Sequence, residues 1–210
     1  FNEALMPMQK SVELSPQDAE AHNNLGITLQ ELGRLDEVEA THRQAIALKP
    51  DYAEAHFNLG ITLQELGRLD EAEVSYQQAI TLKPEYAEAH NNLGNTLQEL
   101  GRLDEAEASL GEAITLRPDS AEAHNNLGNT LKELGRLDVA EASYRQAIYF
   151  KPDYADAHCN LGVTLQDLGR SDEAKASYRQ AIALKPDYAE AHHNLATARK
   201  FSLRDEQFFQ

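Results

Sequence analysis

The chain has 210 residues, with 19 Lys and Arg against 35 Asp and Glu, which gives a net charge of −16. This balance disfavours nucleic acid, because binding a polyphosphate requires clustered Lys and Arg that displace counterions. We therefore expect a protein or peptide partner of basic or neutral character, and no nucleic acid. No apolar run approaches the roughly 20 residues that cross a bilayer, and the first ten residues do not resemble a signal peptide, so we expect no membrane association.

Cysteine usage bears on the compartment. The single cysteine, Cys159, excludes an internal disulfide framework and fits a reducing environment, although a disulfide-free periplasmic protein would show the same usage. We expect a cytoplasmic protein. We also expect Cys159 to be a partly exposed thiol without a special role.

A pattern with a period of 34 residues runs along most of the chain. Proline recurs at this interval at Pro16, Pro50, Pro84, Pro118, Pro152 and Pro186, and leucine at Leu25, Leu59, Leu93, Leu127, Leu161 and Leu195. A constant period of this length indicates an array of stacked units that grows by repetition. Chain length therefore does not set the number of domains.

Each repeat is predicted to be a pair of amphipathic helices. In residues 53–84, apolar residues recur at helical spacing in both halves, at Leu59, Leu63, Leu66 and at Leu69, Ala72, Tyr76, Ile80. Gly67 follows the first stripe, where a left-handed residue can close a helix, and Lys83 and Pro84 close the second. The unit is a helical hairpin that cannot bury its apolar faces alone.

In chain order, residues 1–18 correspond to a second helix without its first. Pro7 falls inside this helix, which is therefore predicted to be kinked, shortened or frayed. Five full repeats follow at 19–52, 53–86, 87–120, 121–154 and 155–188. At the start of one of them, Asp51 and Glu54 have the spacing of a reciprocal helix cap.

Residues 189–210 form one more first helix and a tail that leaves the pattern. In this tail Ser202 and Asp205 are spaced to begin a new helix. The chain thus starts and stops within the pattern. We expect it to be a piece of a larger protein.

These residues resemble the tetratricopeptide repeat family. The spaced pattern of that family has counterparts at Leu59, Gly60, Leu63, Ala72, Tyr76, Ala79 and Pro84, and the match covers nearly the whole chain. The resemblance implies an all-α, right-handed superhelix of antiparallel helix hairpins that recognises proteins. The first position of the family pattern, usually a large aromatic residue, is His22, His56, His90, His124, His158 and His192 here. His42 and Leu110 replace the aromatic residue of the second helix.

No catalytic constellation is evident, so we expect a non-catalytic chain without cofactor or metal. The eight histidines are the only candidates for acid–base or metal chemistry. The six repeated ones are separated by two helix-packing distances, roughly 16–20 Å, which is too far for a shared metal with bonds of about 2 Å. We interpret them as packing residues.

An asparagine recurs in every first helix, at Asn24, Asn58, Asn92, Asn126, Asn160 and Asn194. At about 100° per residue, Asn92 lies within about 60° of Glu88 and Glu99, on the side away from the leucine stripe. By resemblance, this side lines the inside of the superhelix. The amides then form a line along a concave groove, with Asn95 and Asn129 beside it, unless they only bond to neighbouring repeats or reflect recent duplication.

This line is similar to the asparagine ladder of O-GlcNAc transferases, whose amides bind the backbone of an extended peptide. Acidic residues stand four positions before each amide, at Glu20, Glu54, Glu88, Glu122, Asp156 and Glu190, and Phe57, Glu99 and Glu133 also flank the groove. We therefore expect a protein–protein interaction module that binds an extended peptide.

Two other roles remain open. The chain would also suit a regulatory arm of a larger glycosyltransferase or sulfotransferase, since similar arrays precede such domains. It would equally suit a scaffold that self-associates through uncapped ends, with exposed apolar residues at Met8, Val12, Phe201, Phe208 and Phe209.

Overall fold

A computed structural model describes residues 2–208, with the side chains of residues 5–198. Within this part of the chain every regular element is an α-helix. The helices are α1 (Asn2–Leu14), α2 (Ala19–Glu31), α3 (Leu35–Leu48), α4 (Ala53–Glu65), α5 (Leu69–Leu82), α6 (Ala87–Glu99), α7 (Leu103–Leu116), α8 (Ala121–Glu133), α9 (Leu137–Phe150), α10 (Ala155–Asp167), α11 (Ser171–Leu184) and α12 (Ala189–Phe208). The chain divides inside α7, between Glu105 and Ala106, into two compact units, which we call unit 1 and unit 2.

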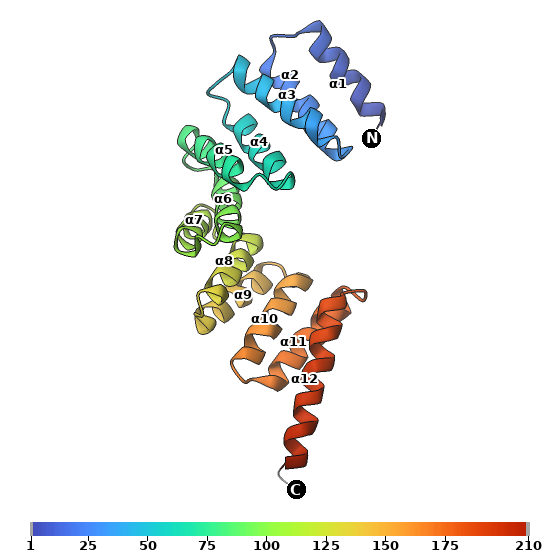
Figure 1. The fold of residues 1–210 in the computed structure, drawn as a ribbon, viewed down its shortest axis with the longest axis vertical. Coiled ribbons are helices and arrows are strands. Elements are labelled where there is room, and N and C mark those ends of the chain that lie inside the picture. The colour runs from blue at the N-terminus through green and yellow to red at the C-terminus, as the bar shows by residue number, and fades with distance from the viewer. Residues whose placement is uncertain (1, 209–210) are drawn as a thin grey trace. The chain divides into compact units, whose positions relative to one another are not determined.

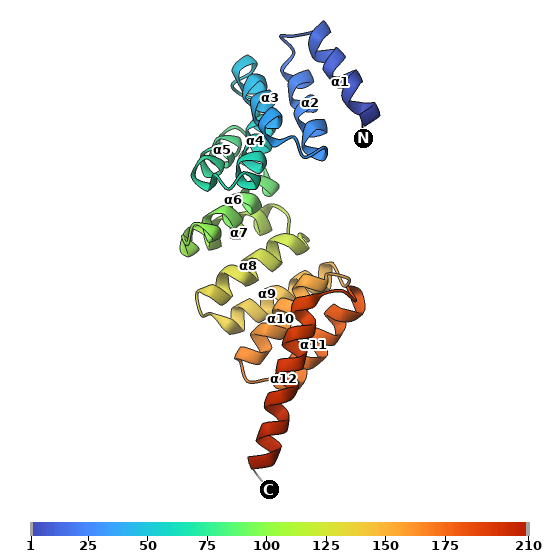
Figure 2. The ribbon, with the colours of Figure 1, turned by 45° about the vertical axis from the view of Figure 1, so that its right-hand side comes forward.

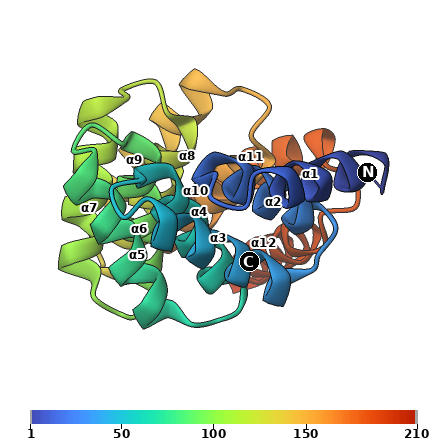
Figure 3. The same ribbon diagram turned by 90° about the horizontal axis from the view of Figure 1, so that it is seen from above.

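Within each unit the helices pack as consecutive hairpins (Figures 1 and 2). In unit 1, α2 packs on α3 and α4 on α5, while α3–α4 and α5–α6 contacts join neighbouring hairpins. In unit 2 the hairpins are α8–α9 and α10–α11, and α12 packs on both α10 and α11. Figure 3 gives the view of the ribbon from above. The predicted all-α arrangement of consecutive helix hairpins is therefore confirmed.

Glycines with positive φ end the first helix of each hairpin. They are Gly33, Gly67, Gly101, Gly135 and Gly169, with φ between 70° and 76°. At Gly67 the backbone N–H donates to the Gln64 carbonyl at 2.9 Å, and the next N–H, of Arg68, reaches back to Leu63. These bonds satisfy carbonyls at the helix end, and glycine adopts the required conformation without steric cost.

Helix α12 continues past the point where the other first helices stop (Figure 2). The 34-residue pattern would place a glycine at position 203, but the residue there is Leu203. No residue with a preference for positive φ therefore interrupts the backbone. The predicted new helix start at Ser202 and Asp205 is wrong, because these residues lie inside α12.

The predicted reciprocal cap of Asp51 and Glu54 is also wrong. Helix α4 begins one residue later than that cap requires, with Tyr52 as its N-cap and no side-chain cap hydrogen bond. The equivalent residue of α2, Asp18, does accept bonds from two backbone N–H groups, at 2.9 and 3.3 Å. Ser120 caps α8 through one such bond, from the Ala123 N–H at 3.2 Å. The capping position therefore lies one residue closer to the helix than the sequence pattern indicated.

The tyrosines at this capping position do not cap the helix and instead contact a lysine. The Lys49 ammonium lies 4.9 Å from the centre of the Tyr52 ring. The pairs Lys83–Tyr86, Lys151–Tyr154 and Lys185–Tyr188 repeat this contact at 4.5 to 4.8 Å. A phenol cannot fold back onto the N–H groups of its own helix as a short carboxylate does, but it offers a ring face to a cation.

Helix α1 is continuous from Asn2 to Leu14 with Pro7 inside it, so the predicted shortening does not occur. A proline lacks one backbone N–H, so Pro7 removes a single hydrogen bond near the start of the helix. The helix is anchored by Leu5, which is 8% exposed and clusters with Leu29 and Val38.

A tyrosine of the second helix packs directly on a glycine of the first helix in three hairpins. A Cβ atom built on Gly60 would lie 2.6 Å from Cε1 of Tyr76, whose side chain is fully buried. The same contact recurs between Gly128 and Tyr144 and between Gly162 and Tyr178. The glycine is therefore required by close approach and not by backbone conformation, since it lies within a regular helix.

His42 takes the place of this tyrosine in the α2–α3 hairpin and packs on Gly26. Its side chain is fully buried, and neither ring nitrogen has a hydrogen-bond partner. Burial lowers the pKa of His42 to about 4. The imidazole is therefore held neutral inside the hairpin at pH 7.

Arginines at the start of the second helices join one repeat to the next. Arg68 pairs with Glu71 in its own helix at 2.6 Å and with Glu39 in the preceding repeat at 2.7 Å. The same bridge to the preceding repeat recurs as Arg102–Glu73 in unit 1 and as Arg136–Glu107 and Arg170–Glu141 in unit 2. The Arg68 guanidinium holds the pKa of Glu71 below its usual range. These arginines are thus engaged by carboxylates of the array itself.

Replacing Gly128 with Ala is expected to destabilise the α8–α9 hairpin by about 1–3 kcal/mol, because the added Cβ would meet the buried Tyr144 ring at 2.6 Å. Gly111→Ala is the matched control, since a Cβ there would meet no atom within 4 Å and should stabilise α7 by about 0.5–1 kcal/mol. Thermal unfolding of both variants tests this pair. Equal shifts for the two would contradict the packing role of Gly128.

His42→Tyr is expected to stabilise unit 1 and to flatten its pH dependence. An unfolded histidine titrates near 6.5, above the value of about 4 in the folded hairpin. The unfolded state therefore binds more protons between these pH values, and stability is lost as pH falls through this window by up to about 3 kcal/mol. Thermal unfolding of both proteins between pH 7.5 and pH 4 should show a difference that grows on acidification. A constant difference would contradict the assignment.

Candidate functional site

The repeated asparagines occupy equivalent positions on the first helices but differ in exposure. Asn24, Asn58 and Asn92 lie in unit 1, and Asn126, Asn160 and Asn194 lie in unit 2. Asn24 is exposed, Asn126 is only 7% exposed, and the other four are half-buried. The amides are therefore neither hairpin-core residues nor a uniformly exposed row.

In unit 1 the amides bond to one another between repeats. Asn58 Nδ2 donates to Oδ1 of Asn23 in the preceding repeat at 3.0 Å, and Asn23 is 3% exposed. One repeat later, Asn92 Oδ1 accepts from its neighbour Asn91 at 3.2 Å. The amide series thus contributes to the contact between consecutive repeats.

Phe57 explains why the bond of Asn58 is not repeated at Asn92. Phe57 stands one repeat after Asn23, where an amide would be needed to accept from Asn92. Its ring packs instead on Tyr86 at 4.8 Å and on Tyr76 at 5.9 Å between ring centres. Phe57, predicted as a groove-flanking residue, is half-buried between repeats.

Unit 2 repeats the bond of unit 1 and adds to it. Asn160 Nδ2 donates to Asn125 Oδ1 and to Asn129 Oδ1, both at 3.1 Å. Asn129 also accepts from the Tyr144 hydroxyl at 2.8 Å. In the other hairpins with a tyrosine the acceptor is Gln64 or Gln166, at 3.0 Å, but α8 has Lys132 at that position. Asn129 thus replaces a missing acceptor, whereas its counterpart Asn95 is half-buried on α6.

Carboxylates border the amides on the first helices. Those predicted to flank the groove are exposed or half-buried: Glu20, Glu54, Glu88, Glu99, Glu122, Glu133, Asp156 and Glu190. Gln64 Nε2 donates to Glu99 Oε1 of the next repeat at 2.8 Å, and Gln30 does the same to Glu65 at 2.9 Å. Glu54 accepts from Lys83 at 3.4 Å. The face that carries the amides is therefore predominantly acidic.

A tyrosine at four of the inter-repeat turns lies beside these carboxylates, and the sequence interpretation missed it. Burial, followed by the charges of Glu54 and Glu88, raises the pKa of Tyr86 to about 12. The same environment surrounds Tyr52 with Glu20 and Glu54, Tyr154 with Glu122 and Asp156, and Tyr188 with Asp156 and Glu190. Carboxylates of successive repeats therefore raise the pKa of the same tyrosine. The signal was available, because these tyrosines follow the 34-residue period except at Ser120.

The repeated histidines bind the inter-repeat turns. His56 Nε2 lies 3.0 Å from the carbonyl oxygen of Pro50, and each of the other five contacts the equivalent proline at 2.8 to 3.1 Å. A carbonyl can only accept, so Nε2 carries the proton in each case. The histidine thus makes a hydrogen bond to the turn, which a Phe or Trp ring at this position could not make to the same carbonyl through a ring nitrogen of this kind.

Cys159 is fully buried, so the predicted partial exposure is wrong. It lies one repeat after Asn125, on the side of the first helix that contacts the next repeat. Burial is the main cause that raises the pKa of its thiol to about 11, followed by the charge of Glu190. This thiol belongs to the contact between repeats.

Within the described residues, no group of three His, Cys, Asp or Glu lies close enough to hold a metal ion. The same part of the chain has no helix that is both long and apolar enough to cross a membrane.

The apolar residues near the two ends were predicted to be exposed. Met8 and Val12 are half-buried, while the side chains of Phe201, Phe208 and Phe209 lie outside the described residues.

Several solved structures share this arrangement. YrrB, titled "a TPR protein with an unusual peptide-binding site", is 26% identical over 89% of this chain and 96% of its own, with a TM-score of 0.70. TTC0263, a thermophilic TPR protein of Thermus thermophilus, is 26% identical over 86% of this chain and 98% of its own, with a TM-score of 0.69. A chain of the APC/C hetero-tetramer Cut9-Hcn1 has a TM-score of 0.82 at 20% identity, over 96% of this chain and 40% of its own. The likeness to Cut9-Hcn1 supports the fold alone.

Comparison with curated proteins gave no match. Family models did match. The TPR repeat model matches residues 31–67, 63–101 and 128–169, and tetratricopeptide repeat models match 8–40, 85–148 and 155–188. Together with the hairpins and their glycine–tyrosine contacts, these matches show that the chain belongs to the tetratricopeptide repeat family.

Proposed function

We propose that the chain is a non-catalytic interaction module that binds an extended peptide of basic or neutral character along the amide-bearing face of its first helices. Tetratricopeptide repeat proteins bind proteins and peptides, and this family membership supports the general function. The finer proposal concerns the amides and their flanking carboxylates. In this proposal, unit 1 and unit 2 each bind peptide along the amides of their own first helices.

The observation that carries the proposal is the shared geometry of Asn58 and Asn160. Each donates through Nδ2 to an amide of the preceding repeat. An amide oxygen has two lone pairs, and within the described residues neither Oδ1 has a hydrogen-bond partner that the structure records. The bond between repeats therefore holds the side chain and leaves its acceptor available for a peptide N–H or a basic side chain.

The charge of this face supports a basic or neutral ligand. The charges of Glu54 and Glu88, on successive first helices, both contribute to the raised pKa of Tyr86, after its burial. A positively charged segment would be attracted to such a row, whereas an acidic one would be repelled.

Two likenesses support peptide recognition. YrrB is titled for an unusual peptide-binding site and covers most of this chain. The amide spacing is similar to the asparagine ladder of O-GlcNAc transferases, in which the amides bind a peptide backbone. We propose the same contact here, in a chain whose amides also bond between repeats.

Asn58→Ala is expected to lower stability by about 0.5–1.5 kcal/mol, through loss of the bond to Asn23. It is also expected to weaken a peptide selected on the wild-type protein from a randomised library, because the acceptor is removed. Asn23→Ala is the matched variant, since it removes the same bond between repeats but leaves the Asn58 amide in place. Fluorescence anisotropy and thermal unfolding measure the two effects.

The two variants separate recognition from structure. We expect similar stability losses for both, and a loss of affinity of about three- to tenfold for Asn58→Ala alone. Equal loss of affinity in both variants would show that the amides act only as links between repeats.

A second prediction concerns salt. The affinity of a Lys-containing selected peptide is expected to fall as salt rises from about 50 mM to 500 mM, because exposed carboxylates are screened over a Debye length of about 10 Å at 0.1 M. Replacing each Lys of that peptide by Gln should remove most of this dependence. An affinity that rises with salt for both peptides would contradict the electrostatic part of the proposal.

A further inference from the structure

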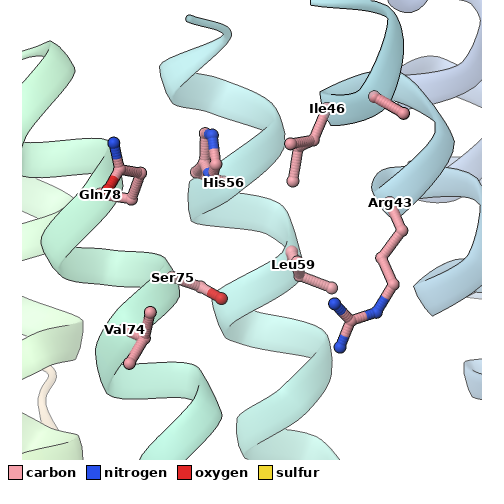
Figure 4. A pocket seen from close by; sticks show the side chains of 8 residues that line it. Arg43, Ile46, His56, Leu59, Val74, Ser75 and Gln78 are labelled. Atoms are coloured by element: carbon pink, nitrogen blue, oxygen red, sulfur yellow. The ribbon is translucent and has the colours of Figure 1, made fainter. Parts of the chain in front are cut away.

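A second groove lies in unit 1 between the two successive second helices, α3 and α5, with α4 as its floor (Figure 4). It has a volume of about 430 Å³. Ile46 of α3 and Val74 of α5 form its walls, and Leu59 and His56 of α4 lie between them. Arg43 and Gln78 line it as well.

This groove does not belong to the amide-bearing face. On α4, the groove residue Leu59 lies about 100° around the helix from Asn58, and the groove residue His56 lies about 160° from it. A ligand in the groove would therefore contact a different side of the hairpins. Binding at the two surfaces can be separated by mutation.

Val74 is an unusual residue at this position. Its side chain is 64% exposed on the wall of the groove. The equivalent position in the other full repeats is alanine, at Ala40, Ala108, Ala142 and Ala176. A branched aliphatic side chain gains nothing from water and has a slightly lower helix propensity than alanine, so its exposure here points to a ligand contact.

The groove continues into an acidic end. An adjoining hollow of about 330 Å³ shares Arg43 and Val74 and adds Leu63, Asp70 and Glu71. The Arg43 guanidinium is already paired with Glu39 at 2.9 Å and with Glu71 at 3.3 Å. Asp70 is exposed, and no ion pair of the described residues includes it. This end therefore keeps a negative charge that a cation can approach.

Unit 2 contains the equivalent groove with different chemistry. It is lined by Arg145, His158 and Leu161, but Ala176 stands in place of Val74. The counterpart of Asp70 is Asp172, which pairs with Lys175 at 3.2 Å. The unit 2 groove thus lacks both the exposed aliphatic wall and the uncompensated carboxylate.

We propose that the α3–α4–α5 groove is a second binding surface, which takes an extended peptide with an aliphatic residue and a Lys or Arg two positions away. Val74 and Asp70 are one helical turn apart, about 6 Å along α5. Residues i and i+2 of an extended chain project to the same side about 6.6 Å apart. The aliphatic side chain enters between Ile46 and Val74, and the cation reaches Asp70.

The test uses the whole chain, with methyl groups of Ile, Leu and Val labelled for NMR, and the acetylated peptide Ser-Leu-Ser-Lys-Ser-Gly as probe. We expect the methyl signals of Ile46, Leu59 and Val74 to shift on titration. Val74→Ala should weaken the peptide about fivefold, and Asp70→Asn about threefold at low salt. Both positions are exposed, so the fold should persist, and methyl signals that stay unshifted away from the substituted residue in the free variants verify this.

Peptide and protein controls identify the surface. Replacing the peptide Lys by Glu should abolish the shifts, and Asn58→Ala should leave them unchanged, which distinguishes this groove from the amide-bearing face. Shifts confined to residues around Asn58, shifts at the unit 2 groove of equal size, or none at millimolar peptide would each overturn the proposal. A tighter fit of a helical peptide with Leu and Lys at i and i+4 would also overturn the extended form proposed here.

Discussion

A tyrosine ring packed on a glycine sets the distance between the two helices of a hairpin, and much of the remaining structure follows from that contact. Tyr76 reaches the surface of α4 only because Gly60 has no Cβ. From this buried position its hydroxyl donates to Gln64, and the amide nitrogen of Gln64 donates in turn to Glu99 of the next repeat. The interior of one hairpin is thereby connected, through two hydrogen bonds, to the acidic edge of its neighbour.

The residue that packs on the glycine, and the acceptor of its hydrogen bond, differ from one hairpin to another. Where the aromatic residue is His42, the ring still packs on a glycine but loses its hydrogen bond, because an imidazole is too short to reach the outer amide. Where the acceptor Gln is replaced by Lys132, Asn129 accepts from Tyr144 instead. Such exchanges keep buried polar groups satisfied, and His42 is the exception, because neither of its buried ring nitrogens has a partner.

The amide-bearing face combines structure with recognition. Asn58 uses its donor for the preceding repeat, which fixes the direction of its oxygen. A preoriented acceptor loses little conformational entropy on binding, and this favours affinity for a ligand backbone. The groove between α3 and α5 is of a different kind, because its contact depends on an exposed aliphatic residue and a carboxylate and not on amides.

The sequence by itself determined the period, the helix pairs and the glycine that ends each first helix, because apolar spacing and the φ preference of glycine are local properties. It also placed the amides away from the leucine stripe. Only the tertiary structure decided what lies between repeats. Cys159 is buried there, Asn58 bonds to Asn23, and carboxylates of successive repeats raise the pKa of one turn tyrosine. These contacts join residues about 35 positions apart, and helical periodicity within one repeat carries no information on how the next repeat packs against it. At Leu203 the deciding residue was local and visible in the sequence. The pattern would place a glycine there, and with leucine in its place α12 continues through the capping pattern of Ser202 and Asp205.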